Sequence, residues 1–251
     1  MKSALVGYTG FVGSNLRGQA TFDVLVNSSN VDELRGRSFA LVACAGARAE
    51  KWKASRDPAA DLAGIERLLS VLEEVRAERF VLVSTVDVFE TPAGVDESAS
   101  ADARHAYGRN RRKLEELCAE RFGAQVLRLP GLFGPGLKKN AVYDLLHGYQ
   151  VEKIHPDSTY QFYDVRQLWP DAEKADRAGI RLLHLSAEPL SMHEIASVCF
   201  GRELSPPSGV PAHYDVRSRH AGLWGGRDGY LRSREEVLRG LAQFVREEQA
   251  S

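Results

Sequence analysis

Residues 1–14, MKSALVGYTGFVGS, contain the pattern that decides the fold. A short apolar run at residues 4–6 leads directly into three glycines, which is the order of a buried strand, a tight turn and the start of a helix. The first glycine permits the turn, the second lets a pyrophosphate approach the backbone and the free N–H groups of the helix start, and the third lets helix and strand pack closely. An ordinary glycine turn is the alternative, but the strand before it and the helix after it favour a dinucleotide site. The residues expected to form that site are Gly7, Thr9, Gly10, Phe11, Val12 and Gly13.

The composition limits the class of protein. The chain has 251 residues, of which 43% are hydrophobic, so it can bury a sizeable core. Its 33 basic and 34 acidic residues nearly balance, which gives no electrostatic case for a nucleic-acid partner. The three cysteines, Cys44, Cys118 and Cys199, lie far apart without metal-ligand spacing, so we expect cytosolic thiols and no metal site. No apolar run is long enough to cross a bilayer and the N-terminal stretch is not a secretion signal, so we expect a cytoplasmic protein with no membrane partner.

Strand and helix patterns alternate along the rest of the chain. Apolar runs predict further strands at residues 22–26, 39–44, 80–83, 126–130 and 182–185. Helices are predicted at residues 15–20, from 57, at 107–121, from 138, at 192–200 and at 233–248. This alternation predicts an α/β fold with a doubly wound parallel sheet, which binds ligands at the carboxyl ends of its strands.

Two of these strand ends carry candidate cofactor contacts. A carboxylate at the end of the second strand would bond the ribose hydroxyls of NAD, but this chain has only small neutral groups there, Asn27, Ser28 and Ser29. Such groups tolerate a 2′-phosphate and favour NADP(H) slightly, with an ordinary turn as an equal alternative. The third strand ends in small residues that leave room for a cofactor, Cys44, Ala45 and Gly46.

A tyrosine and a basic residue follow the strand that ends at Thr85. Tyr107 and Arg111 are four residues apart in a predicted helix and therefore share one helix face. Such a pair is common on protein surfaces, and it gains weight here because it follows that strand end. Asp87 lies two residues beyond Thr85, on the same side of an extended strand. A substrate contact, a second acid/base and a solvated carboxylate are all open for Asp87, and the last is the most common.

These motifs together resemble the extended short-chain dehydrogenase/reductase family, in its NAD-dependent epimerase/dehydratase branch that modifies sugar nucleotides. The resemblance runs along most of the chain, from the GxxGxxG turn to RLPGLFGP at residues 128–135 and HLS at residues 184–186. It implies a Rossmann core at residues 1–136, completed by a late strand near 180–187, and a small C-terminal substrate-binding lobe formed by residues 137–179 and 188–251. The family usually runs longer, so this lobe is trimmed.

The resemblance also implies roles for individual residues. Thr85 matches the residue that bonds the reacting oxygen of the substrate, and Tyr107 matches the acid/base. Pro130 and Gly131 match the turn beside the nicotinamide. Asn140, with Lys138 near it, resembles the contact to the nucleotide diphosphate.

Arg111 stands where the family has a lysine that holds the nicotinamide ribose and lowers the pKa of the tyrosine. An arginine keeps the positive charge and its donors, so it can still favour the tyrosinate, but it cannot release a proton at working pH. Arg111 is therefore expected to contact the cofactor without relaying a proton.

The sequence and the resemblance together predict an NAD(P)-dependent oxidoreductase or epimerase that acts on a sugar nucleotide or a related keto or hydroxy compound. Tyr107 would move the proton on the reacting oxygen while hydride passes to or from the nicotinamide. One alternative is a non-catalytic dinucleotide-binding sensor or scaffold, in which Arg111 marks lost chemistry. Another is a reductase of a small carbonyl compound without a nucleotide, which the trimmed lobe favours. A homodimer is compatible with either enzyme.

Overall fold

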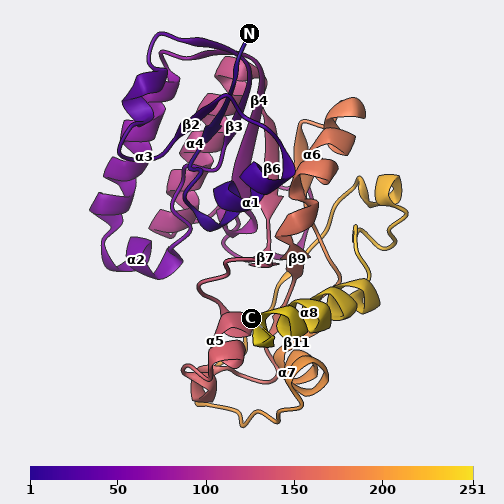
Figure 1. The fold of residues 1–251 in the computed structure, drawn as a ribbon. Helices are drawn as coiled ribbons and strands as arrows, with labels where there is room; N and C mark the ends of the chain where they lie inside the picture. Colours follow the sequence, from indigo (N-terminus) through magenta and orange to yellow (C-terminus); the bar gives the residue numbers. More distant parts are fainter. Residues whose placement is uncertain (251) are drawn as a thin grey trace. The chain divides into compact units, whose positions relative to one another are not determined.

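The computed structural model describes residues 1–250 and divides the chain into two compact units. The first unit contains Met1–Glu90, Ser100–Arg128 and Arg166–Leu183, and the second contains Thr91–Ala99, Leu129–Val165 and the chain from His184 onward. These boundaries differ from those expected in four places. Residues 91–99, 129–136 and 184–187 belong to the second unit, whereas residues 166–179 belong to the first. Figure 1 shows the elements of both units coloured along the sequence.

The first unit is built around a six-stranded sheet with the order β10-β6-β4-β3-β1-β2. The strands are β1 (Ser3–Val6), β2 (Val24–Val26), β3 (Ser38–Cys44), β4 (Arg76–Thr85), β6 (Gln125–Leu129) and β10 (Leu182–His184). β1 pairs in parallel with β2 on one side and with β3 on the other, and β3 pairs in parallel with β4. The chain therefore changes direction across the sheet at β1, which confirms the doubly wound sheet and puts the glycine turn at the switch point.

Helices cover both faces of this sheet (Figure 1). They are α1 (Phe11–Gln19), α2 (Lys51–Arg56), α3 (Pro58–Leu72), α4 (Ala106–Phe122) and α6 (Leu168–Arg177). α3 packs against α4, and α1 packs against α6. α3 begins where the sequence predicts, because Asp57 accepts a hydrogen bond from the Ala60 N–H at 3.0 Å and Pro58 follows it.

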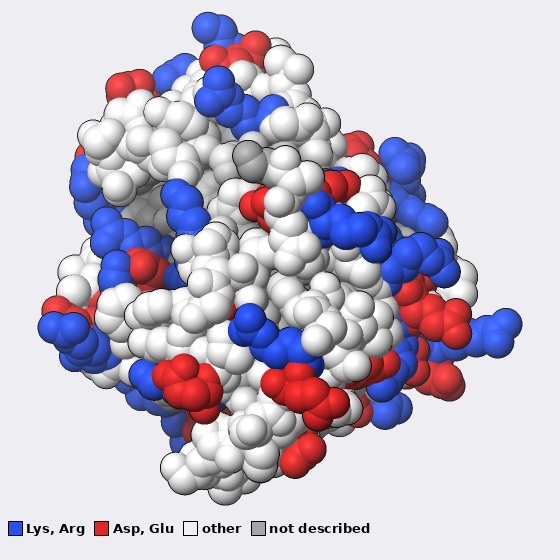
Figure 2. Space-filling model, turned by 60° about the horizontal axis from the view of Figure 1, so that its bottom comes forward, with Lys and Arg blue, Asp and Glu red and all other residues white. Residues whose placement is uncertain are grey.

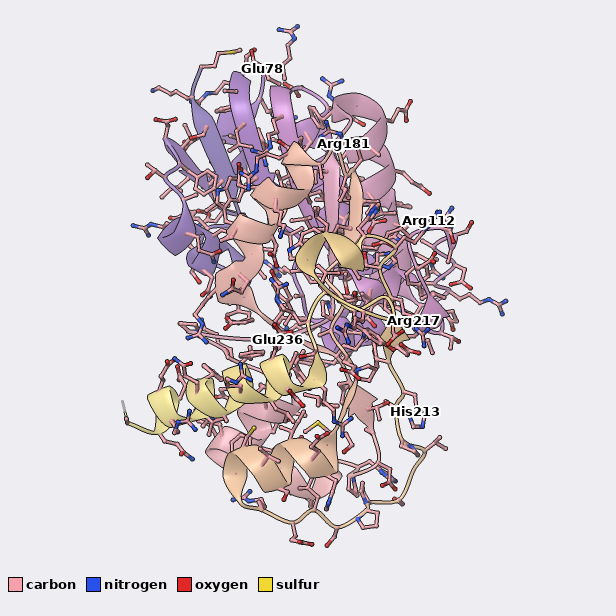
Figure 3. The ribbon with its side chains drawn as sticks, turned by 90° about the vertical axis from the view of Figure 1, so that its right-hand side faces the viewer. Glu78, Arg112, Arg181, His213, Arg217 and Glu236 are labelled. Atoms are coloured by element: carbon pink, nitrogen blue, oxygen red, sulfur yellow. The ribbon has the colours of Figure 1, made fainter. Side chains whose placement is uncertain are left out.

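Helix α6 belongs to the first unit because it is bonded to α1. The Trp169 N–H donates to the Gln19 side-chain oxygen at 2.9 Å, and the Trp169 ring meets Phe22 edge-on at 5.6 Å. From the sequence, residues 166–179 were expected in the substrate lobe. Their contact partners in α1 lie some 150 residues away in the chain, so no local pattern indicates this packing. At the edge of the sheet where β4 and β10 begin, Figure 3 labels Glu78 and Arg181.

The second unit contains three longer helices and three two-stranded ribbons. The helices are α5 (Ala141–His147), α7 (Met192–Phe200) and α8 (Arg234–Gln249), and the ribbons pair β7 (Gly131–Phe133) with β9 (Phe162–Asp164), β8 (Thr159–Tyr160) with β11 (Leu190–Ser191), and β5 (Ala93–Val95) with β12 (Asp215–Val216). Ser191 caps α7, because its hydroxyl accepts the Glu194 N–H at 3.1 Å. Ser233 and Glu236 form a capping box at the start of α8, where Figure 3 labels Glu236.

His184 has a structural role in this unit. It is fully buried, and its Nδ1 lies 2.9 Å from the Arg217 carbonyl oxygen. Its backbone N–H donates to Glu97, whose carboxylate also accepts from the Ser218 hydroxyl at 2.6 Å. Arg217, labelled in Figure 3, lies on the segment between α7 and α8. This glutamate therefore ties that segment to His184.

The charges of the surface are mixed, in keeping with the balanced composition. Figure 2 shows Lys and Arg interspersed with Asp and Glu over one face of the molecule. None of the helices in residues 1–250 is both long enough and apolar enough for a membrane span.

Candidate active site

The three glycines of the first turn differ in what surrounds them. Gly7 has φ +84°, and a Cβ there would lie 2.4 Å from the Ala45 carbonyl oxygen. A Cβ on Gly13 would lie 2.0 Å from the Gly7 carbonyl oxygen, so α1 packs on the turn with no room for a side chain. A Cβ on Gly10 would meet only that same oxygen, at 3.4 Å, which is an ordinary contact. Gly7 and Gly13 are therefore required by the fold, whereas the space in front of Gly10 is left open by the protein.

Gly10 is also the N-cap of α1, and its helix start suits an anion. No side chain caps the first turn, and that turn carries no acidic residue. The first N–H groups of a helix have no partner within the helix, and the helix dipole adds partial positive charge there. With the open space before Gly10, the chain fits the pyrophosphate of a dinucleotide.

A cavity of about 540 Å³ extends from this turn within the first unit. Gly7, Asn27 and Ser28 line it on one side, and α2 and α3 line it on the other. Gly46 and Ala47 lie between these walls, at the end of β3. The volume and the position at the carboxyl ends of parallel strands are those of a site for a small organic ligand.

An arginine of α3 lies beside the segment that follows β2, and no sequence motif indicated it. Arg67 of α3 donates through Nη1 to the Ser28 carbonyl oxygen at 3.0 Å, and its Nη2 lies 2.7 Å from Asp32 Oδ2. Ser28 and Arg67 both line the cavity. Ser29 takes part in a local turn instead, because its N–H and hydroxyl both donate to Asn27 Oδ1, at 2.8 and 2.6 Å.

Cys44 differs from its expected role as a cofactor contact. Its side chain is completely buried in the core beneath β3, and burial raises the pKa of its thiol to about 11. In the part of the chain that the structure describes, the residues lining the cavity at this strand end are Gly46 and Ala47.

Tyr107 lies at the start of α4, against the end of β4. Its side chain is 6% exposed, and the Thr85 hydroxyl is hydrogen-bonded to it. The same hydroxyl accepts the Asp87 N–H at 3.1 Å, which leaves its own hydrogen available as a donor. The structure therefore brings Thr85 and Tyr107 together as expected.

The pKa of Tyr107 is raised to about 12, mainly because burial disfavours the phenolate. Asp87 and Asp61 raise it further, whereas Arg111 and the bond from Thr85 lower it. Arg111 thus acts in the expected direction, but burial outweighs it. Tyr107 is consequently a neutral phenol over the physiological pH range.

Arg111 is buried and its donors are engaged inside the protein. Its guanidinium carbon lies 3.9 Å from the centre of the Tyr107 ring. Nη1 forms an ion pair with Asp61 of α3 and donates to the Tyr107 carbonyl oxygen at 3.3 Å, and Nη2 donates to the Arg48 carbonyl oxygen. The expected position of Arg111 beside the tyrosine is therefore observed, together with a partner, Asp61, that the sequence did not indicate.

Asp87 is not a solvated carboxylate. Its side chain is 18% exposed, and its Oδ1 lies 2.7 Å from Lys51 Nζ of α2. The backbone of Asp87 packs on the start of α4, where a Cβ on Gly108 would lie 2.3 Å from the Asp87 carbonyl oxygen. The acid is thus held next to Tyr107 by an ion pair and by close backbone packing.

A buried charged triad lies beneath these residues. Glu115 of α4 accepts a hydrogen bond from the Ser84 hydroxyl of β4 at 2.5 Å and pairs with Arg128 of β6, with Nη2 and Oε2 2.7 Å apart. All three residues are less than 9% exposed. Helix α4 is therefore fixed to two strands of the sheet two helical turns beyond Tyr107.

Comparison with known proteins identifies the family. The model of the NAD dependent epimerase/dehydratase family matches residues 21–157, which is more than half of the chain. The chain belongs to the NAD dependent epimerase/dehydratase family. The match begins after the glycine turn, so the assignment of Gly7, Gly10 and Gly13 depends on their own geometry. A comparison with curated proteins gives no match.

Three solved structures of similar fold are a reductase, an epimerase and a protein solved with NADPH. A dTDP-4-dehydrorhamnose reductase from Clostridium acetobutylicum is 17% identical with a TM-score of 0.76, and the match covers 99% of this chain and 100% of that one. A UDP-glucose 4-epimerase from Thermotoga maritima, solved with UDP-glucose, is 16% identical with a TM-score of 0.72 and the same coverage. RMD from Pseudomonas aeruginosa, solved with NADPH, is 20% identical with a TM-score of 0.73, again with 99% and 100% covered. These likenesses confirm the Rossmann-type fold of the epimerase/dehydratase family.

Four expected site residues of this family member lie in the second unit. Pro130 is buried, and Gly131 opens β7, where a Cβ would lie 2.9 Å from the Gln161 carbonyl oxygen. Asn140 caps α5 with φ +145°: its Oδ1 accepts the Tyr143 N–H at 3.0 Å, and its Nδ2 donates to the Leu132 carbonyl oxygen at 2.7 Å. Lys138 is exposed. The Asn140 amide thus organises its own loop, a role that the family resemblance did not indicate.

Sequence reasoning missed the residues that reach the site from α2 and α3. Lys51, Asp61 and Arg67 have no motif, and each meets its partner only after the helices fold onto the sheet. One signal was available for Asp61, because it lies one turn after the N-cap Asp57, in a helix whose apolar side faces the core. The opposite side of such a helix is the one that faces a ligand or solvent.

Proposed function

We propose that the protein is an NAD(P)-dependent oxidoreductase that acts on a sugar nucleotide or a related keto or hydroxy compound. The observation that carries this proposal is the buried Tyr107 phenol, bonded to Thr85 at the carboxyl end of β4. The glycine turn and its cavity occupy the same unit of the chain. The relatives of similar fold support the substrate class: one is a reductase of dTDP-4-dehydrorhamnose, and another was solved with UDP-glucose.

The residues of the first unit supply the parts that this chemistry needs. The turn at Gly10 and the start of α1 would hold the pyrophosphate of a nicotinamide dinucleotide, which, when bound, donates or accepts the hydride. Thr85 would orient the reacting oxygen of the substrate by a hydrogen bond. Tyr107 would deliver its phenolic proton to that oxygen, or take a proton from it in the reverse direction. Because the pKa of Tyr107 is about 12, the tyrosine begins as the protonated donor that reduction of a carbonyl requires.

We propose further that the cofactor is NADP(H). Ser28 follows the end of β2 and offers no carboxylate, and the guanidinium of Arg67 lies beside it on the cavity wall. Arginine is the usual partner of a 2′-phosphate, and a carboxylate at this position would repel it. Asp32 is paired with both Arg67 and Arg35, which lower its pKa and compensate its negative charge.

Calorimetry tests the choice of cofactor without knowledge of the substrate. We expect NADPH to bind more tightly than NADH, and Arg67→Ala to remove most of that difference. Arg56→Ala is the matched control, because Arg56 lines the same cavity from α2. Tighter binding of NADH than of NADPH by the wild-type protein would contradict the preference.

Turnover tests the chemistry. The purified protein is given NADPH with a panel of 4-keto sugar nucleotides and, separately, small carbonyl compounds, and the loss of NADPH absorbance is followed. We expect Tyr107→Phe to lower the rate by about 10²–10⁴. Tyr149→Phe, which changes a tyrosine that is 57% exposed in the second unit, should leave the rate unchanged. Equal rates for wild-type and Tyr107→Phe proteins would remove the tyrosine from the mechanism, and NADPH binding without any turnover would favour a sensor or scaffold.

A further inference from the structure

The ion pair between Asp61 and Arg111 is buried and joins two helices of the first unit. The side chain of Arg111 is 3% exposed and that of Asp61 is 11% exposed. Removing two charges from water is costly, and a buried pair persists only where further hydrogen bonds satisfy its remaining donors and acceptors. Such bonds are present on both sides. Asn110 Nδ2 donates to Asp61 Oδ2 at 2.7 Å, and the carbonyl oxygens of Arg48 and Tyr107 accept from Arg111.

We infer that Asp61 is a positioning residue, which holds the Arg111 guanidinium over the Tyr107 ring and compensates its positive charge there. The inference rests on the proposed role of Tyr107 as the acid/base. The distance of 3.9 Å between the guanidinium carbon and the ring centre is that of a cation–π contact. Because Asp61 binds Arg111 from α3, the position of the guanidinium depends on a residue of another helix.

Because Asp61 compensates the charge of Arg111, Tyr107 stays protonated although the guanidinium is next to its ring. An unpaired guanidinium this close would favour the phenolate strongly, since an opposite charge within about 4–6 Å shifts a pKa by about 1–3 units. Asp61 opposes that effect and itself raises the pKa of Tyr107. The ion pair thus places a guanidinium against the Tyr107 ring without lowering the pKa of the phenol enough to make it a base.

Other charged groups lie around Tyr107 and also influence its pKa. Asp87 raises the pKa of Tyr107, and Lys51 of α2 is paired with that acid. His105, the N-cap residue of α4, has its own pKa lowered by burial and by Lys51. A change at Asp61 therefore acts on the pKa of Tyr107 in two ways, directly by loss of its own negative charge and through the uncompensated charge of Arg111.

The test follows the Tyr107 phenol directly, by NMR of protein with ¹³C-labelled tyrosine rings. The Tyr107 signal is assigned from its loss in Tyr107→Phe. We expect the wild-type signal to keep its protonated shift to about pH 11, and Asp61→Asn to lower the titration midpoint by about 1–3 units. Asp57→Asn is the matched control, because Asp57 lies on the same cavity and asparagine also caps helices well.

Two further variants keep the test decisive. Asp61→Ser leaves room for a water beside the guanidinium and should lower the midpoint in the same way if Asp61→Asn does not fold. Asp61→Asn with Arg111→Met removes both charges, and its Tyr107 should keep the high midpoint. An unchanged midpoint in folded Asp61→Asn or Asp61→Ser would overturn the inference.

The outcome for Asp61 can be separated from that for the proposed reaction. The titration needs no substrate, so it reports on Asp61 even if turnover is absent. If Tyr107→Phe abolishes turnover while folded Asp61→Asn leaves both the midpoint and the alkaline limb of the rate profile unchanged, the reaction stands and the role of Asp61 fails. If Asp61→Asn lowers the midpoint while Tyr107→Phe retains full turnover, the positioning stands and the acid/base role fails.

Discussion

Replacing Gly10 by valine should remove cofactor binding and leave the fold intact. Gly10 has φ −76° and ψ 168°, an extended conformation that any L-residue adopts. A Cβ there would have its nearest protein neighbour, the Gly7 carbonyl oxygen, at 3.4 Å. The added side chain would therefore occupy the open space before the helix start, where the pyrophosphate is expected.

The expected magnitudes differ widely between stability and binding. Valine caps a helix less well than glycine, which costs about 1 kcal/mol and lowers Tm by about 2–4 °C for a chain of this size. Binding would lose hydrogen bonds between backbone N–H groups and a charged phosphate, each worth about 1.5–3 kcal/mol. Loss of two such bonds weakens the affinity by about 10²–10⁴-fold.

Calorimetric titration with NADPH and a thermal melt measure both effects. Gly18→Ala is the matched control on the same helix, because a Cβ there meets nothing within 4 Å; we expect unchanged affinity. Gly13→Ala should instead destabilise the protein, since its Cβ would lie 2.0 Å from the Gly7 carbonyl oxygen. A folded Gly10→Val protein that binds NADPH with wild-type affinity would refute the assignment of the turn.

Three other predictions concern the first unit. Ser28→Asp should shift the ratio of NADPH to NADH affinity toward NADH, because a carboxylate accepts the ribose hydroxyls and repels a 2′-phosphate; an unchanged ratio by calorimetry would count against the cofactor site. Because the pKa of Tyr107 is about 12 in the folded protein and about 10 in the unfolded chain, the free energy of unfolding should fall by up to about 3 kcal/mol as pH rises from 10 to 12. Tyr107→Phe should lose less stability over that range in urea titrations, and equal losses would contradict the raised pKa. Arg128→Met should lower the free energy of unfolding by about 3–5 kcal/mol, because it leaves Glu115 charged and buried. The double variant Arg128→Met with Glu115→Gln should lose less stability, and equal denaturation midpoints for the two variants would argue against the ion pair.

Much of the sheet could be predicted from sequence because its strands leave a local signal. Fully buried parallel strands need continuous apolar side chains, so the runs at residues 39–44 and 126–130 lie where β3 and β6 form. The caps Asp57, Ser191 and Ser233 mark helix starts by side-chain chemistry that acts within three residues. Segment 166–179 could not be assigned to its unit, since the Gln19–Trp169 bond joins distant parts of the chain.

The candidate site likewise contains residues that sequence motifs predict and residues that only the folded structure brings in. Thr85, Tyr107 and Arg111 follow from motifs, and the structure brings them together. The contacts of Arg67 with Ser28 and of Arg111 with Asp61 span 39 and 50 residues. They depend on how α3 lies over the sheet, which no local pattern specifies. The high pKa of Tyr107 escaped prediction because burial, its main cause, is a property of the packed protein.

The triad of Ser84, Glu115 and Arg128 limits how Tyr107 can move. A helix that turned by one residue would rotate its side chains by about 100°, and one that slid by one turn would shift them by about 5.4 Å. Either motion of α4 would separate Glu115 from both strands and expose two opposite charges to an apolar interior. The Tyr107 phenol is therefore held in place by the buried ion pair behind it, and in the proposed reaction it would be the substrate that moves to reach the geometry of proton transfer.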